Sequence, residues 1–287
     1  MAPRFERVAI AGVGLIGGSL ALAARRAGIF GEVIGCARRS ETLAEARQRG
    51  IIDRGSSDPL EAARGADLLV LAVPVRAIVS LGRQCLPALA PGAIITDAGS
   101  VKGEIVRELD SLVTRGRSFV GAHPIAGTEE QGPAAADPNL FANQLCIVTP
   151  SALTDAHAAD RIQALWEAVG MRVERMSPER HDAVLAAVSH LPHVVAFALV
   201  NAITAAGSEL PRYSGGSLRD ATRVASSSVE MWRDILLSNS AAIDEALAGF
   251  SSELQRLREV IRRGDESELE RLLAHGHEAR CTWGRSA

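Results

Sequence analysis

The pattern of apolar and polar positions changes once along the chain, near residue 176. Before that point, short and nearly continuous apolar runs alternate with stretches whose apolar residues recur at helical spacing. Such runs are typical of strands covered on both faces, and strand–helix alternation requires crossover connections. The pattern therefore predicts an α/β fold, a Rossmann-type doubly wound, mostly parallel sheet with helices on both faces. The predicted strands are 7–11, 32–36, 67–73, 93–97, 118–122, 145–149 and 172–176, and the helices between them include 15–27, 40–49, 75–86, 102–115 and 155–169.

The second part of the chain shows helical periodicity only. After Ser177-Pro178 no strand pattern follows, and the helical pattern is broken near Leu210-Pro211 and Gly215-Gly216. Leu and charged residues then repeat in helical register on both sides of Gly264-Asp265. We expect a dinucleotide-binding Rossmann domain at 1–176 and an all-helical domain for substrate binding and dimerisation at 177–287.

The helical part carries more apolar residues than a sheetless domain has neighbours to cover. A second copy of the chain would cover them, so we expect a homodimer with the helices between Asn239 and Leu273 as the main contributors. The length of 287 residues suits two domains, and 47% hydrophobic with 23% charged residues is ordinary for a soluble protein. A net charge of −3 without basic runs argues against nucleic acid or a membrane surface as partners.

The cysteines and the N-terminus bear on the compartment. The cysteines form no CxxC pair and no disulfide-dense pattern, so we expect reduced thiols in the cytoplasm. Arg4 and Arg7 precede an apolar stretch, 8–24, that superficially resembles a signal peptide. The glycines inside that stretch favour a strand, a turn and a helix start instead, and we expect no membrane span elsewhere. The cysteines are Cys36, Cys85, Cys146 and Cys281.

A glycine-rich loop follows the first predicted strand. In Gly12-x-Gly14-x-x-Gly17, the first glycine permits a tight turn, the second lets a pyrophosphate approach the backbone, and the third lets the helix pack on the strand. The helix N-terminus then offers free N–H groups to phosphates. The loop predicts a nicotinamide dinucleotide as cofactor. The expected cofactor contacts here are Gly12, Gly14, Leu15, Ile16 and Gly17, with Val73 and Pro74 at the end of a later strand.

The end of the second predicted strand bears on the choice between NAD and NADP. An acidic residue there would accept the ribose hydroxyls of NAD, but Arg38, Arg39 and Ser40 come first and no carboxylate precedes Glu41. Two guanidinium groups and a hydroxyl suit a 2′-phosphate, which favours NADP. The alternative is that the arginines are solvated loop charges that stack on the adenine of either cofactor.

Two segments place polar side chains beyond the carboxyl ends of neighbouring strands, where a doubly wound sheet binds its ligands. Ser100 follows the strand 93–97, and His123 follows the strand 118–122. Ser100 is also well placed to cap the helix that begins near Lys102. His123 is flanked by Pro124 and is expected in a fixed turn, with a buried structural histidine as the alternative.

The helical part contributes further candidates. His190 and His193 are three residues apart and share a helix face, and Pro192 is expected to kink that helix. No acidic or cysteine partner has convincing spacing for a metal, and the tail His275-x-His277-x-x-x-Cys281 is more typical of a helix end, so we expect no metal.

A third set of candidate site residues lies between positions 219 and 232. Arg219 and Arg223 flank a helical turn with Asp220, which can orient one of them, although exposed salt bridges are the alternative. Trp232 either lines the site or fills the core.

Taken together, these segments resemble the prephenate/arogenate dehydrogenases of tyrosine biosynthesis (the TyrA family). The resemblance covers nearly the whole chain in the order of that family. It implies an oxidoreductase that oxidatively decarboxylates a cyclohexadienyl acid and passes hydride to NAD(P). The segments are GVGLIGGS (12–19), AVPV (72–75), DAGSVKG (97–103), AHPIAGTE (122–129), SHLPH (189–193), RDATRVASS (219–227) and MWRDI (231–235).

The resemblance also implies roles for individual residues. His123 would hydrogen-bond the ring hydroxyl, Ser100 would support it beside the nicotinamide, and Arg223 would hold a substrate carboxylate. A neutral imidazole with the ordinary pKa near 6.5 suits such a base, and an arginine suits a carboxylate. The remaining expected substrate contacts are His190, His193, Glu129, Trp232 and Asp220.

The sequence departs from the family pattern at one place and allows alternative functions, so it does not identify the substrate. The family often has an aromatic residue before the arginine motif, where this chain has Gly215-Gly216-Ser217-Leu218, so side-chain preference between prephenate and arogenate is not set. We expect neither a chorismate mutase segment nor a regulatory domain. A dehydrogenase for 4-amino-4-deoxyprephenate, a β-hydroxyacid-type dehydrogenase with a lysine base in its helical domain, and a non-enzymatic NADP-sensing protein are the alternatives.

Overall fold

The structure is a computed structural model that describes residues 3–113, 116–128 and 130–283. It divides after Asn239 into two compact units, each described by itself below. The first unit contains the sheet and most of the helices, and the second is formed by residues from Ser240 onward.

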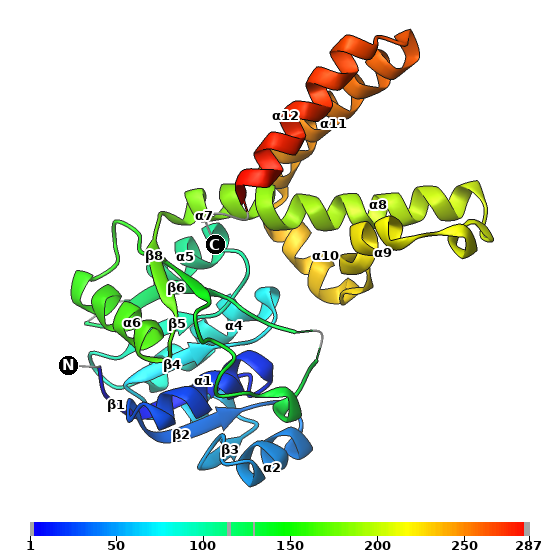
Figure 1. Cartoon of the computed structure of the whole chain (residues 1–287). Helices are drawn as coiled ribbons and strands as arrows, with labels where there is room; N and C mark the ends of the chain where they lie inside the picture. Colours follow the sequence, from blue (N-terminus) through cyan, green and yellow to red (C-terminus); the bar gives the residue numbers. More distant parts are fainter. Residues whose placement is uncertain (1–2, 114–115, 129, 284–287) are drawn as a thin grey trace. The chain divides into compact units, whose positions relative to one another are not determined.

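The described part of the first unit is built on an eight-stranded sheet (Figure 1). Its strands are β1 (Phe5–Ala11), β2 (Phe30–Cys36), β3 (Arg54–Ser56), β4 (Leu68–Leu71), β5 (Ile94–Asp97), β6 (Ser118–Ile125), β7 (Leu145–Thr149) and β8 (Arg172–Arg175). Their order is β3-β2-β1-β4-β5-β6-β7-β8, parallel at every pairing except the antiparallel pair β6–β7. The order reverses between β1 and β4, the place where such sheets bind ligands. The predicted doubly wound, mostly parallel sheet is confirmed.

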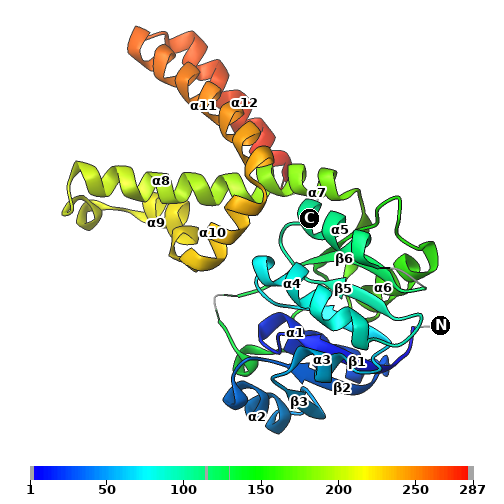
Figure 2. The same ribbon diagram turned by 180° about the vertical axis from the view of Figure 1, so that it is seen from behind.

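Helices cover both faces of the sheet (Figure 2). Apolar side chains such as Leu20 and Trp166 pack one group of helices onto one face, and Ile78 and Leu109 pack another group onto the other. The first group is α1 (Leu15–Arg26), α2 (Ser40–Gln48) and α6 (Ala156–Ala168), and the second is α3 (Pro59–Ala63), α4 (Val75–Cys85) and α5 (Gly103–Leu112). Strands such as β4 are buried at every residue, which explains their continuous apolar sequence.

Sequence analysis missed β3 and α3. The three residues of β3 include the exposed Arg54 and Gly55, so they carry no apolar run that would mark a strand. Helix α3 has only five residues, too few for a clear period, and its N-terminus is set by Asp58, whose carboxylate accepts a hydrogen bond from Leu60 N. The strand–turn–helix of β1 and α1 is confirmed in place of a signal sequence.

Strand β6 extends beyond its parallel neighbour. Ser118 to Val120 pair with β5, whereas Gly121 to Ile125 pair only with the antiparallel β7. His123 therefore lies past the carboxyl end of β5 but still in a strand, opposite Ile147. The expected fixed turn at His123 is wrong because β7 supplies the backbone hydrogen bonds that a turn would have replaced.

The remaining α-helices of the first unit follow β8 along the chain. They are α7 (Pro178–Leu185), α8 (Leu191–Ala206), α9 (Gly216–Thr222) and α10 (Val229–Ser238). Helix α7 contacts α5, and α10 contacts α4. Between α7 and α8, residues Ala186–His190 form a π-helical turn directly before Pro192. Pro192 was expected to disturb the helix, and the widened turn is how the backbone accommodates it.

The helical stretch Pro178–Ala206 is apolar and has 29 residues, long enough by length and composition to cross a membrane. The expectation of no membrane span stays a prediction, because length and composition alone do not place a helix in a membrane. The core helix of a soluble protein satisfies the same criterion, and α7 carries buried polar groups that bond the sheet domain. Only 22% of its most apolar window is buried within the single chain, so most of that window is exposed there.

The second unit consists of α11 (Ser240–Arg263) and α12 (Glu266–Trp283), which pack against each other. Gly264 at the break between them has φ of +67°, a conformation that favours glycine at a helix end. The predicted break at Gly264-Asp265 is confirmed. The predicted domain boundary at 176/177 falls between β8 and α7, within the first compact unit, and stays a prediction.

Candidate active site

The glycine loop joins β1 to α1 at the switch point of the sheet. Gly12 has φ of +91°, and a Cβ there would lie 2.1 Å from Ala72 O. A Cβ on Gly17 would lie 2.0 Å from Gly12 O, so any side chain would push α1 off the strand. A Cβ on Gly14 would meet nothing closer than 3.8 Å, so the loop has open space where a pyrophosphate would approach. The roles expected for the three glycines fit this geometry.

The other predicted cofactor residues surround that loop. Val73 lies beside Gly12, with its Cγ1 3.0 Å from the position of a Gly12 Cβ, and Pro74 is the N-cap of α4. Leu15 and Ile16 form the start of α1 and are half-buried. These residues line the carboxyl ends of β1 and β4, which is where a dinucleotide would lie in this fold.

Arg38, Arg39 and Ser40 follow β2 on the exposed surface. Within the described part of the chain, neither guanidinium forms an ion pair, whereas Ser40 Oγ donates to the Glu41 carboxylate at 3.1 Å. Arg39 is the N-cap of α2, so its side chain leaves the loop at the start of that helix. Two exposed cations therefore lie near the end of β2, one strand away from the glycine loop.

A fully buried ion pair joins the two catalytic segments. Lys102 Nζ bonds Asp97 Oδ2 and donates to Ala122 O at 2.9 Å, and the Asp97 carboxylate accepts from the N–H groups of Gly99 and Ala122. Both side chains have no exposed surface. Lys102 Nζ and both oxygens of Asp97 thus have hydrogen-bond partners, and removing one partner of such a pair typically costs about 3–5 kcal/mol. The pair holds the loop of Ser100 beside the strand of His123.

Ser100 is half-buried directly before Val101 and Lys102. The expectation that it caps the following helix is wrong. Helix α5 begins at Gly103, and its free N–H groups at Lys102 and Gly103 donate to the two oxygens of Asp182, at 2.8 and 2.7 Å. A carboxylate from α7, 80 residues away in sequence, does the capping, so the Ser100 hydroxyl is left for another role.

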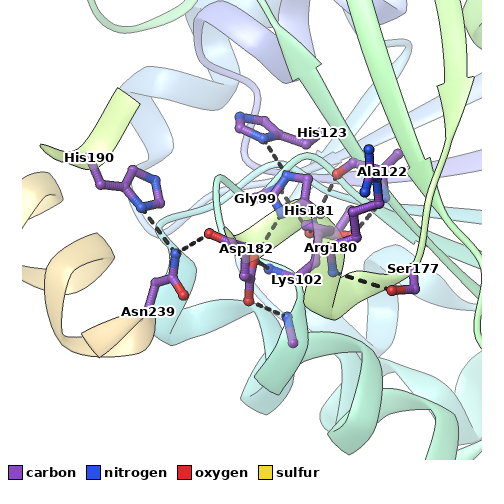
Figure 3. A network of polar contacts seen from close by, with 12 residues as sticks. Gly99, Lys102, Ala122, His123, Ser177, Arg180, His181, Asp182, His190 and Asn239 are labelled. Carbon is purple, nitrogen blue, oxygen red and sulfur yellow. Dashed lines mark hydrogen bonds and ion pairs between the residues drawn. The ribbon is translucent and has the colours of Figure 1, made fainter. Parts of the chain in front are cut away.

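His123 is buried and contacts another histidine. Its Nδ1 lies 2.9 Å from His181 Nε2, and His181 Nδ1 lies 2.8 Å from Asp182 Oδ1 (Figure 3). Burial lowers the pKa of His123 well below the ordinary value, and the charges of His181, Lys102 and His190 lower it further. The expected ordinary pKa near 6.5 is therefore wrong, because the sequence did not show how deeply the ring is enclosed.

His190 is buried at the end of the π-helical turn. Its Nδ1 lies 3.1 Å from Asn239 Nδ2, which also donates to Asp182 O at 2.8 Å. Burial lowers the pKa of His190 to about 4, with Asp182 opposing that shift. Among the described residues, His190 Nε2 has no hydrogen-bond partner although it is buried. This nitrogen is an unused polar group beside Trp232, whose ring lies 6.0 Å from that of His190.

His193 stacks on Trp232 with 3.5 Å between ring centroids, and its Nδ1 donates to Ser189 O. Burial lowers the pKa of His193, and the charge of Arg223 adds to that effect, which places Arg223 near this ring. Trp232 is 6% exposed and packs on Val101, next to Ser100. The structure thus brings His190, His193, Trp232 and Arg223 toward the catalytic segments.

Two predicted residues are less informative. Asp220 is exposed on α9, three residues before Arg223. Its expected role in orienting an arginine stays a prediction. Glu129 lies outside the described residues. In the tail, His277 Nε2 lies 3.6 Å from Cys281 Sγ on α12, which ends at Trp283. The expectation that this tail is a helix end and not a metal site stays a prediction.

Sequence analysis missed five residues of this network. Asp97 and Lys102 were quoted only as parts of a motif, and His181, Asp182 and Asn239 were not singled out at all. A signal existed for the first two, since a lysine five residues after an aspartate at a strand end is unusual for a buried segment. His181-Asp182 had no such signal, because polar residues at a helix start are ordinary.

Family comparisons agree with this geometry. The nucleotide-binding domain of prephenate dehydrogenase matches residues 20–175, and the dimerization domain of prephenate dehydrogenase matches residues 177–275. The chain belongs to the prephenate dehydrogenase family.

Individual relatives match over almost their full length. A cyclohexadienyl dehydrogenase from Zymomonas mobilis is 40% identical over 270 residues, which cover 92% of each chain. The crystal structure of prephenate dehydrogenase from Aquifex aeolicus, in complex with hydroxyphenyl propionate and NAD+, superposes with a TM-score of 0.92 at 39% identity, covering 96% of this chain and 98% of that one. The structure of Synechocystis arogenate dehydrogenase gives 0.85 at 30% identity, covering 96% and 99%.

Membership in this family makes the chain an oxidoreductase with an NAD(P)-binding Rossmann domain. The β-hydroxyacid and cofactor-sensing alternatives are not favoured. The identities of the substrate, the preferred cofactor and the roles of single residues depend on the geometry described above.

Proposed function

We propose that this member of the prephenate dehydrogenase family oxidatively decarboxylates prephenate or arogenate in tyrosine biosynthesis, with His123 as the catalytic base. The observation that carries the proposal is the position of His123 past the carboxyl end of β5, with Nδ1 engaged by His181 and the ring kept neutral by burial. A neutral imidazole at that edge is suited to accept a proton from a substrate hydroxyl.

The chemistry needs such a base. The carbinol carbon loses its hydrogen as hydride while the carboxylate on the opposite ring carbon leaves as CO₂. The electrons of the bond between that ring carbon and its carboxylate stay in the ring and make it aromatic. The glycine loop of Gly12, Gly14 and Gly17 would hold NAD(P), which would supply the hydride acceptor. His123 accepts the hydrogen bond of the ring hydroxyl and takes its proton as the carbon becomes carbonyl-like, and the proton returns to that oxygen when the aromatic ring forms the phenol. The Ser100 hydroxyl, freed from helix capping, supports the same oxygen.

The helical residues would hold the acidic groups of the substrate. Arg223 offers a two-pronged guanidinium near His193, and the buried Nε2 of His190 has no partner among the described residues. Trp232 and His193 form a stacked apolar wall beside the ring. Since two substrate carboxylates must leave water, each needs a partner of this kind.

We infer NADP as the preferred cofactor, with NAD as the alternative. The support is the pair of exposed cations after β2, Arg38 and Arg39, at the place where a carboxylate would otherwise select the ribose hydroxyls of NAD. The NAD+ in the Aquifex aeolicus complex belongs to a relative and is the reason to test both cofactors.

We further propose a cytoplasmic homodimer in which the part from 177 to 287 supplies both substrate contacts and the dimer surface. The support is the match to a dimerization domain together with exposed apolar side chains on α8, α11 and α12. Light scattering at micromolar concentration should give about twice the chain mass of 30.2 kDa. A mass equal to one chain would contradict the homodimer. The exposed side chains include Val200, Leu254, Ile261 and Leu273.

One assay tests the activity. The purified chain is mixed with prephenate or arogenate and with NAD or NADP, and formation of the reduced nicotinamide is followed by its absorbance. We expect activity with at least one of the two acids and a lower KM for NADP than for NAD. Activity confined to 4-amino-4-deoxyprephenate, or no reduction with any of the three acids, would overturn the proposal.

A further inference from the structure

Three side chains form a continuous hydrogen-bonded row behind the proposed base. His123 comes from β6, whereas His181 and Asp182 are neighbours on α7 (Figure 3). The two contacts are 2.9 Å between His123 Nδ1 and His181 Nε2, and 2.8 Å between His181 Nδ1 and Asp182 Oδ1. All three residues are buried, so water does not compete for these bonds.

The charge of Asp182 decides which atom donates in the hydrogen bond between His181 and Asp182. Its two oxygens accept the N–H groups of Lys102 and Gly103, and although burial alone would raise the pKa of Asp182, these bonds and the one from His181 lower it. Asp182 is therefore an ionised carboxylate, which only accepts. The proton in its contact with His181 must belong to His181 Nδ1.

The proton on His181 Nδ1 then decides which ring donates in the hydrogen bond between His123 and His181. Burial lowers the pKa of His181, so its ring is neutral and carries one proton, which is already on Nδ1. His181 Nε2 is therefore an acceptor, and the proton between the two rings belongs to His123 Nδ1. A neutral His123 with its proton on Nδ1 has a free lone pair on Nε2.

We propose that His181 and Asp182 are positioning residues that hold His123 in the tautomer whose Nε2 can accept a proton from the substrate hydroxyl. The proposal rests on the proposed role of His123 as the base. It assigns a function to two residues that would act on the substrate hydroxyl through His123. The same Asp182 carboxylate caps α5, three residues after Ser100, so one group sets both the base and the start of the helix behind the serine.

A purely structural role would need less. The cap of α5 uses Asp182 alone, and His181 could fill its space as any apolar ring of similar size. Only the bond from His123 Nδ1 depends on the acceptor that His181 presents. The two roles therefore differ in what an apolar replacement of His181 would do to the protonation of His123.

Nitrogen-15 NMR of the imidazole rings in the intact wild-type chain reads this protonation directly, without substrate. The His123 signals are assigned by their loss in His123→Asn. We expect a protonated Nδ1 and a bare Nε2 for His123 at pH 7.5. A wild-type His123 with its proton on Nε2 would overturn the proposal even if dehydrogenase activity is normal, and absent activity with the expected tautomer would overturn the proposed function alone.

Two variants of His181 distinguish its proposed role as a hydrogen-bond acceptor for His123 from a role in packing alone. In His181→Gln, the amide nitrogen can donate to Asp182 and the amide oxygen can accept from His123 Nδ1, so the polarity is kept. In His181→Phe, the ring volume is kept and the acceptor is lost. We expect His181→Phe to lower kcat by about 10²-fold, within the range that base assistance contributes, with KM changed by less than about threefold. The Gln variant should recover at least a tenth of wild-type kcat.

The matched control is His157→Gln on the exposed start of α6, which should keep wild-type kcat. If His181→Phe fails to fold, the wild-type tautomer and the Gln variant still decide. Equal kcat in folded His181→Phe and wild type would overturn the proposal. An equal loss in the Gln and Phe variants, with the Gln variant folded and its His123 tautomer unchanged, would also overturn it.

Discussion

Asn239 Nδ2 lies 3.1 Å from His190 Nδ1 and 2.8 Å from the backbone oxygen of Asp182. A backbone oxygen only accepts, so the atom facing both groups is the amide nitrogen, and it donates to His190 Nδ1. Since burial lowers the pKa of His190 to about 4, the ring is neutral at pH 7 and its single proton is on Nε2. His190 thus presents a buried donor, whereas His123 presents an acceptor.

The first prediction concerns Asn239, which sets the donor state of His190. Asn239→Ala should raise the KM for the cyclohexadienyl substrate about fivefold, the equivalent of about 1 kcal/mol for one hydrogen bond, and leave kcat nearly unchanged. Steady-state kinetics measure both constants. Asn201→Ala on the exposed side of α8 is the control and should resemble wild type. A loss confined to kcat would show that His190 acts in the chemical step instead.

The second prediction concerns the base. His123→Asn keeps a polar side chain in the strand but removes the proton acceptor, so kcat should fall by about 10²–10⁴-fold with a smaller change in KM. Turnover measured at saturating substrate tests this, with the exposed His157→Asn as the control. Near-normal turnover in His123→Asn would remove His123 from the mechanism.

The third prediction concerns pH. His123 works in its neutral form, and burial, with the charges of His181, Lys102 and His190, lowers its pKa well below the ordinary value. The neutral form is present above the folded-state pKa and is lost as the pH falls through it. The acidic limb of kcat/KM should therefore lie clearly below pH 6.5, and the profile should be flat near neutral pH. A limb centred at or above pH 6.5 that disappears in His123→Asn would contradict this interpretation of the site.

The fourth prediction concerns the cofactor. If Arg38 and Arg39 bind a 2′-phosphate, replacing both with alanine should raise the KM for NADP by about tenfold or more, since each charge-assisted bond contributes about 1.5–3 kcal/mol at most. The KM for NAD should stay within about twofold. Arg47→Ala, an exposed arginine of α2, is the control. An equal effect on both cofactors would mean that the arginines stack on adenine.

The fifth prediction concerns Arg223. Its removal would leave a substrate carboxylate without its partner, a loss that typically costs about 2–5 kcal/mol, so Arg223→Ala should raise KM strongly with a smaller fall in kcat. Arg223→Lys should restore only part, because an ammonium lacks the two-pronged geometry. The exposed Arg107→Ala on α5 serves as control. Unchanged KM with abolished turnover would assign Arg223 to the transition state.

Local sequence patterns predicted much of the fold because they reflect local physics. The apolar runs of β1 and β4 mark strands buried on both faces, and Gly12 and Gly17 mark close backbone approaches. The exposed three-residue β3 gave no such signal. The same limit explains His123, whose strand continues only because the antiparallel β7 lies beside it.

The sequence by itself determined the alternation of strands and helices, the glycine loop, the position of Ser100 after a strand, and the family to which these segments belong. Only the tertiary structure decided which groups surround them. Asp182 caps α5 from 80 positions away, His181 contacts His123 across 58 positions, and Lys102 is enclosed with Asp97. The physical reason is that hydrogen-bond direction, burial and pKa depend on neighbours in space, which the local periodicity of a sequence does not encode.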